Sequence, residues 1–137
     1  MSASAAARSA LIEDADYWRG QPPDAGDGLP HKEWHHFVIF GSGWTILFNL
    51  NLDGDGAGRT ITILGEDDAW HGHVARCPSP RLRRGRLDAT FDRAGMRWRG
   101  GRYEIWQQGE GVRLEATLDP VSMPSLSHHI PLGQGAI

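Results

Sequence analysis

The chain contains very little cysteine, since Cys77 is the single thiol among its 137 residues. One thiol cannot form an internal disulfide, so the fold does not depend on one, and a reducing compartment such as the cytoplasm is the simpler location. Cys77 directly precedes Pro78 at the expected end of a strand, and no sequence neighbour is placed to activate it. The sequence therefore excludes a disulfide scaffold and gives little support for a cysteine enzyme.

Long apolar runs and a strong charge excess are also missing. No stretch of about 18 apolar residues occurs, so the sequence predicts no transmembrane helix, and contact with a membrane would be peripheral. The first ten residues lack the basic start and apolar core of a signal peptide. The net charge is −3, and the longest basic run, residues 81–86, is short. These values do not indicate a protein that binds nucleic acid.

Glycine is abundant, with 18 residues, and long helical patterns are few. Both features favour an all-β protein with many turns. A turn is expected at Ala94–Gly95, before the short stretch 96–98. Seven strands are expected, over residues 33–40, 44–52, 59–64, 70–76, 85–93, 102–108 and 112–118. An antiparallel meander of this kind either closes as a barrel or stacks as a sandwich.

The first 32 residues differ from the remainder of the chain. Residues 5–17 are compatible with a short helix capped by Ser4, although acidic residues near its carboxyl end oppose it. Residues 21–30 have the proline- and glycine-rich composition of a loop. We therefore expect a partly ordered leader over residues 1–32 that covers or docks on a β domain spanning residues 33–137. The apolar end at residues 135–137 suggests that a further segment or a partner chain continues the structure.

The segment from Glu33 to Leu52 is the most informative part of the sequence, because two β-rich runs flank the turn Gly41-Ser42-Gly43. This pattern predicts a β-hairpin. Adjacent His35 and His36 must point to opposite faces of a strand, so they cannot bind one metal together. Groups that can move protons stand beside aromatic rings, which favours a ligand-binding β domain and, less strongly, an enzyme.

Other candidate residues have two interpretations each. Asn49 and Asn51 would aim their amides into a cavity if the strands form a barrel, or face solvent otherwise. Trp44 would line a pocket or pack in a core. His71 and His73 share a strand face and would bind zinc only if further ligands came from elsewhere. No metal-binding motif supports such a site, so no cofactor is expected, and hydrogen-bonded histidines on a half-buried strand are the alternative.

Several short motifs resemble one known family. They are Glu33-Trp34-His35-His36-Phe37, the segment from Met96 to Tyr103, and Leu118-Asp119-Pro120 followed by Pro124, His128-His129 and Pro131-Leu132-Gly133. Together they look like the amino-terminal lipocalin-like domain of the carotenoid 1,2-hydratase family, which includes hydroxyneurosporene synthase, the AttH-like proteins and lipocalin-like cyclases. The similarity runs over residues 30–137.

The resemblance implies an all-β, lipocalin-like barrel or half-barrel around an apolar cavity, completed by a second β domain or a partner chain. Members act on long isoprenoid or polyketide chains without a metal or organic cofactor. A hydratase of carotenoid biosynthesis, which is a lyase, protonates an alkene, forms a tertiary cation and lets water capture it. This chemistry needs a carboxylic acid kept protonated by burial, aromatic faces for the cation and a site that excludes stray water.

Mapped onto this chain, the resemblance implies a catalytic acid or water-orienting base at Glu33 and a proton relay at His35 or His36. It also implies aromatic walls at Trp34, Trp44 and Trp106, and the predicted substrate-binding residues further include Asn49, Asn51 and Tyr103. Two further hypotheses remain open. One is a lipocalin-like carrier that holds an apolar ligand without catalysis, and the other is a structural domain whose open sheet edge recruits a second copy or a second domain.

Overall fold

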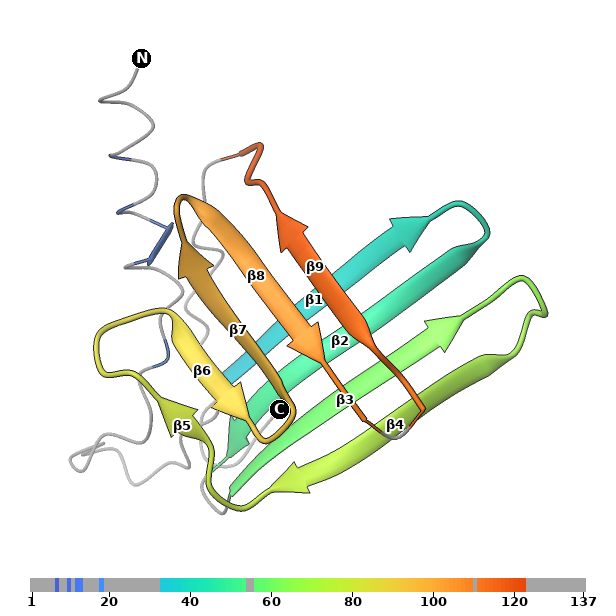
Figure 1. Ribbon diagram of the computed structural model, residues 1–137, viewed down its shortest axis with the longest axis horizontal. Helices are drawn as coiled ribbons and strands as arrows, with labels where there is room; N and C mark the ends of the chain where they lie inside the picture. Colours follow the sequence, from blue (N-terminus) through green and yellow to red (C-terminus); the bar gives the residue numbers. More distant parts are fainter. Residues whose placement is uncertain are drawn as a thin grey trace, which may run out of the picture.

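A computed structural model shows a protein built from two antiparallel β-sheets (Figure 1). The structure describes residues 33–53, 56–109 and 111–122, together with Ala7, Ala10, Ile12, Glu13 and Trp18. The first sheet contains β1 (Glu33–Gly41), β2 (Trp44–Asp53), β3 (Gly56–Leu64) and β4 (Trp70–Cys77). The second contains β5 (Arg81–Leu82), β6 (Asp88–Phe91), β7 (Ala94–Arg99), β8 (Arg102–Gln107) and β9 (Leu114–Leu118). In each sheet every strand pairs with the next along the chain.

The prediction of an all-β antiparallel meander is confirmed, but a closed barrel does not form. Among the described residues, no backbone pairing joins β4 to β5 or β9 to β1. Pro78 and Pro80 follow β4 and have no N–H group to donate to a sheet ladder, so the meander is interrupted there. The two sheets pack against each other, and their strands cross in Figure 1.

The space between the sheets is a packed core rather than the apolar cavity that a barrel would enclose. Side chains alternate along each strand, so every second residue faces the opposite sheet. Both sheets contribute fully buried side chains, among them Phe48, Leu50, Ile61, Phe91, Met96 and Ile105. Burial of these side chains supplies the main stabilisation of the fold. A ligand would therefore bind at the margin of the sandwich.

The described residues form nine strands, whereas seven are expected from the sequence. The two-residue strand β5 was not predicted, and the strand expected over residues 85–93 is limited to Asp88–Phe91. The turn expected at Ala94–Gly95 lies instead at Asp92–Arg93, where Asp92 adopts a φ of 56°. Gly95 is instead part of β7. The indole of Trp106 crosses the space that a side chain at position 95 would fill, which explains why this strand position is a glycine. The sequence pattern predicts a turn at Gly95, but this glycine makes room for the Trp106 side chain within a strand.

Most of the leader, including Ser4, the loop at 21–30 and the greater part of the helix expected over residues 5–17, lies outside the described residues. Ala7, Ala10, Ile12 and Glu13 have helical conformation, although no helix forms an element in the described part of the chain. Ile12 and Trp18 are buried in the core of the β-sandwich. These two side chains therefore belong to the same hydrophobic core as the strands.

A buried polar pair connects the two sheets. Arg59 of β3 donates through Nη1 to Oε1 of Gln107 of β8 at 2.7 Å, and both residues are buried. The amide of Gln107 donates in turn to the carbonyl oxygen of Gln108 at 3.1 Å. A hydrogen bond to a charged donor is stronger than a neutral one, and burial requires that it be made. The pair therefore fixes how β3 lies relative to β8.

Candidate functional site

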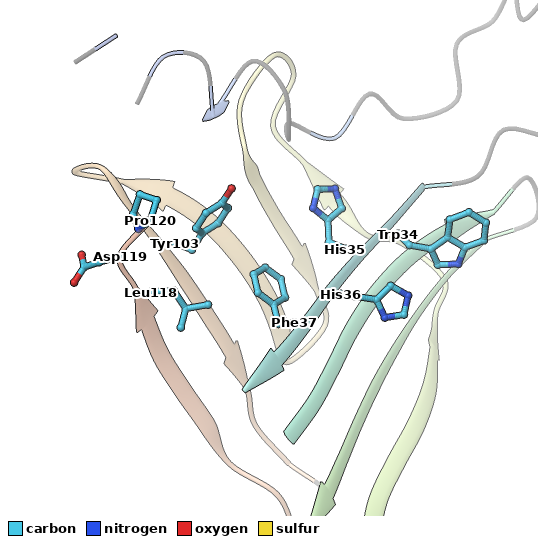
Figure 2. A pocket seen from close by; sticks show the side chains of 8 residues that line it. All are labelled: Trp34, His35, His36, Phe37, Tyr103, Leu118, Asp119 and Pro120. Carbon is cyan, nitrogen blue, oxygen red and sulfur yellow. The ribbon is translucent and has the colours of Figure 1, made fainter. Parts of the chain in front are cut away.

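A cleft of about 470 Å³ lies at the side of the sandwich where the chain does not connect the sheets (Figure 2). One wall is β1, and the other is formed by β8, β9 and the residues after β9. The lining residues are Trp34, His35, His36, Phe37, Tyr103, Leu118, Asp119 and Pro120. Among the described strands, β1 and β9 are both edge strands, so the cleft opens between the edges of the two sheets.

Aromatic side chains cross the floor of this cleft from one sheet to the other. Phe37 of β1 meets Tyr103 of β8 edge to face, with ring centroids 6.0 Å apart. Behind them, Phe48 lies 6.0 Å from Phe37, and Trp98 lies 4.8 Å from Tyr103. Edge-to-face pairs at these separations are attractive and hold the rings in defined orientations. The floor is therefore a pre-formed apolar surface suited to rings or alkyl chains.

The two adjacent histidines occupy different surroundings, as the strand periodicity predicted. Figure 2 shows His35 on the side of β1 that faces Tyr103, whereas His36 points to the other side. The His35 ring packs against Trp18, with centroids 4.1 Å apart. Asn49 Nδ2 lies 3.0 Å from His36 Nε2, within hydrogen-bonding distance. Of the two imidazoles, His35 faces the aromatic floor.

The open rim of the cleft carries charge. Asp119 follows β9 and pairs with Arg102 at the start of β8, with Nε and Oδ1 2.8 Å apart. Both side chains are exposed to solvent, so the pair contributes little stability. It does place a carboxylate and a guanidinium beside Pro120 at the entrance. A ligand with one polar end would thus meet hydrogen-bonding groups at the rim and apolar rings below it.

The structure brings together four of the predicted site residues and separates the others. Trp34, His35, His36 and Tyr103 line the cleft. Glu33 is the half-buried first residue of β1, adjacent to the cleft but not among the residues that line it.

Three predicted residues of β2 lie away from the cleft floor. Trp44 is exposed at the tip of the β1–β2 hairpin, where its indole covers Gly41. Asn49 lies on the outer face of the first sheet and binds His36. Asn51 shares that face and lies against Gly58. The amides that a barrel would have aimed inward therefore point away from the core.

Trp106 belongs to a different cleft, of about 390 Å³, on the outer face of the second sheet. The guanidinium of Arg97 lies 5.3 Å from the centre of its indole, a cation–π contact. Arg97 also binds Glu104, as does Arg99, and hydrogen bonds from these two guanidinium groups lower the pKa of the Glu104 carboxyl. Trp106 alternates with buried Ile105 and Gln107, so strand geometry directs it to this outer face.

The remaining chemical candidates find ordinary structural roles. His71 Nε2 bonds to Asp67 Oδ2 at 2.8 Å, and this hydrogen bond lowers the pKa of Asp67. In the part of the chain that the structure describes, no three His, Cys, Asp or Glu side chains gather as a metal site would require. Cys77 is buried, and desolvation raises the pKa of its thiol. A thiol of this kind is not an activated nucleophile.

Sequence reasoning missed Phe37, Leu118, Asp119 and Pro120 as cleft residues and Trp18 as the ring behind His35. Phe37 had a usable signal, since it shares a strand face with His35. Leu118, Asp119 and Pro120 formed one of the motifs behind the family resemblance, without a role. For Trp18 the sequence offered no signal of this kind, because it is simply a large apolar residue in the leader.

The chain has no significant match among protein-family models, curated proteins or solved structures. The resemblance to the carotenoid 1,2-hydratase family therefore remains an expectation from short motifs. Within the described residues, no helix has the length and apolar character needed to span a membrane.

Proposed function

We propose that the protein is a binding module that holds a small apolar ligand in the cleft between β1 and β9. The observation that carries this proposal is the aromatic floor of Phe37 and Tyr103 beneath a rim with Asp119. The cleft volume of about 470 Å³ falls within the range of small-molecule sites in proteins, roughly 300–1,000 Å³.

The ligand class follows from the distribution of polar groups. Both apolar and hydrogen-bonding side chains line the cleft, with the Phe37 and Tyr103 rings and Leu118 on the apolar side and His35 and Asp119 among the polar groups. An elongated isoprenoid with one hydroxyl group fits this distribution, because its chain would cover the rings while its hydroxyl meets the rim. The family resemblance points to the same class of substrate.

Binding of farnesol, measured by isothermal titration calorimetry, tests this proposal with two neighbouring residues of β9. Leu118→Asp places a carboxylate in the cleft, and we expect the dissociation constant to rise at least tenfold, about 1.4 kcal/mol. Thr117→Asp adds the same charge on the exposed opposite face of the strand and should leave the affinity unchanged. Equal affinity in both variants, or no binding by the unmodified protein, would contradict the proposal.

A second candidate is a cofactor-free hydratase or cyclase acting on a polyene. It is favoured by proton-carrying groups beside aromatic faces, namely His35 and Tyr103 in the cleft and Glu33 at its end. In this mechanism Glu33 donates a proton to a terminal alkene, a tertiary cation forms over the rings, and water captures it. His35 then returns a proton to the carboxylate. The water molecule supplies both the hydroxyl group and the proton that is regenerated.

Incubation with an acyclic carotenoid, followed by mass spectrometry, distinguishes the two candidates. The enzyme hypothesis predicts a product heavier by one water molecule and at least a tenfold slower reaction in Glu33→Gln, because a general acid contributes about 10²–10⁴-fold. Glu115→Gln, on the exposed face of β9, is the matched control and should keep the full rate. Binding without any heavier product would exclude the hydratase and leave the carrier.

A further inference from the structure

The two outward faces of the sandwich differ sharply in charge. The second sheet presents a network of ion pairs to solvent, as expected for a hydrated surface. Arg99 and Glu104 approach to 2.8 Å, and Arg113 and Glu115 to 3.1 Å. Arg97 also pairs with Glu104. A surface of this composition needs no further partner.

The first sheet presents the opposite composition. Four cross-strand rows make up its outward side, which we term the outer apolar face. The rows are Trp34–Asn51–Gly58–Arg76, His36–Asn49–Thr60–Val74, Val38–Leu47–Thr62–Gly72 and Phe40–Thr45–Leu64–Trp70. Arg76 carries the one formal charge among these residues, and it stands at a corner. The rest are apolar, small or neutral polar.

The apolar residues of this face are well exposed. Phe40 is 76% exposed, Val74 74%, Trp70 55% and Val38 53%. Monomeric proteins rarely expose contiguous apolar patches larger than a few hundred Å². Exposure of this extent indicates a surface that is covered when the protein functions.

Two glycines, Gly58 and Gly72, lie within the β3–β4 half of the face. A β-carbon at Gly72 would stand 2.6 Å from the carbonyl oxygen of Ile61, and one at Gly58 would stand 2.8 Å from Asn51 Oδ1. The backbone of β3 therefore excludes a side chain at position 72, whereas at position 58 only the end of the Asn51 side chain is in the way, and with glycine at both positions the sheet surface is low there. A low, pleated surface can approach another sheet at the separation of about 10 Å that is usual for stacked sheets.

From these features we infer that the outer apolar face packs against the same face of a second copy of the chain. In a twofold-symmetric dimer identical patches meet, so a face free of charge clusters suffers little like-charge repulsion. The ion-paired face of the second sheet would instead bring many charged groups into contact and bury them. The distribution of charge therefore makes the outer face of the first sheet the better self-complementary interface.

The available area agrees with a dimer. Four strands of 8–10 residues cover a plane of roughly 550 Å², from a rise of about 3.3 Å per residue and a strand spacing of about 4.8 Å. The accessible area of protruding Trp, Phe, Val and Leu side chains exceeds their planar footprint, which brings the face close to the ~800 Å² per partner of stable interfaces. An anionic lipid surface fits less well, because the face has one cation and the chain a net charge of −3.

Sedimentation velocity of the full chain at concentrations from about 1 to about 100 µM tests this inference. We expect the unmodified protein to move to the dimer as concentration rises, from a protomer of 15.1 kDa. Val74→Lys places a charge within the face and should raise the dimer dissociation constant at least tenfold. Thr117→Lys, exposed on the second sheet, adds the same charge elsewhere and should leave dimerisation unchanged.

Three outcomes would overturn the inference. They are a protein that stays monomeric throughout this range, a Val74→Lys protein that dimerises as well as the unmodified one, and a monomer that sediments with phosphatidylcholine vesicles. The first would leave a different macromolecule as the occupant, and the third would identify lipid. Val74 is exposed, so Val74→Lys should fold normally; Phe40→Ser, which removes an exposed ring without adding charge, should weaken the dimer independently. Farnesol affinity is measured separately, because neither variant touches the cleft.

Discussion

Replacing Trp18 by alanine is expected to lower the free energy of unfolding by about 3–5 kcal/mol, the usual cost of removing a buried large aromatic ring. The indole is 2% exposed and lies 4.1 Å from the His35 ring and 5.1 Å from the Phe91 ring, centroid to centroid. Its loss would open a cavity between His35 of β1 and Phe91 of β6, in the core between the two sheets. Equilibrium unfolding in urea, followed by far-ultraviolet circular dichroism, measures the change.

Trp44→Ala is the matched control for this experiment. Trp44 is 40% exposed at the hairpin tip, and its indole rests on Gly41 rather than in the core. We expect a smaller loss of about 1–2 kcal/mol, since two-fifths of the side chain is already exposed and its removal leaves no cavity in the core. If the two variants unfold at the same urea concentration, Trp18 does not belong to the cooperative core.

Gly95→Ala is expected to cost about 2–3 kcal/mol, although alanine normally favours folding over glycine. The added β-carbon would stand 2.2 Å from Cζ2 of Trp106 and 2.5 Å from the carbonyl oxygen of Ala89. The indole can rotate away, but the Ala89 oxygen belongs to the neighbouring strand β6 and cannot move without shifting the ladder. Thermal unfolding measures the loss, and near-ultraviolet circular dichroism reports the displaced indole.

Gly65→Ala provides the comparison for Gly95→Ala. Its nearest neighbour would be Asp67 Oδ1 at 3.3 Å, the end of an exposed side chain that can move aside. We expect a change of about 0.5 kcal/mol or less in either direction. Equal destabilisation by both substitutions would show that backbone entropy, rather than the close approach of β6 and Trp106, governs the requirement for glycine at position 95.

Local pattern was sufficient to predict the first sheet. The β1–β2 hairpin follows from two β-rich runs around Ser42–Gly43, and Gly43 adopts the φ of 78° that such a turn favours. The opposite orientations of His35 and His36 follow from strand periodicity alone. Both predictions depend on neighbours in sequence, which is why they could be made without a structure.

Closure of the barrel could not be predicted in the same way. Whether β9 pairs with β1 depends on residues some 80 positions apart, and whether β5 continues the ladder of β4 depends on two prolines at the corner. The expected cavity required a closed barrel, and in its place the described strands enclose a packed core. The β1–β9 cleft exists for the same reason, since a closed barrel would have joined those two edges.

The orientation of Trp106 could have been predicted from the sequence alone. It alternates with Tyr103, Ile105 and Gln107, so the period of the strand assigns it to the face shared with Glu104. The family resemblance implies a substrate-facing ring at Trp106, whereas the strand period directs it to the outer face. Trp18 differs, because nothing local distinguishes a leader tryptophan that enters a core from one that remains in solvent.

The separation of the two sheets has a mechanical consequence. The described chain crosses between them at residues 78–80, on the side opposite the cleft, and no backbone hydrogen bond of the described strands spans the β1–β9 side. Widening that side therefore stretches side-chain contacts such as Phe37 against Tyr103 and leaves every strand ladder intact. Along that margin, side-chain contacts between the two sheets take the place that a backbone ladder would have in a closed barrel.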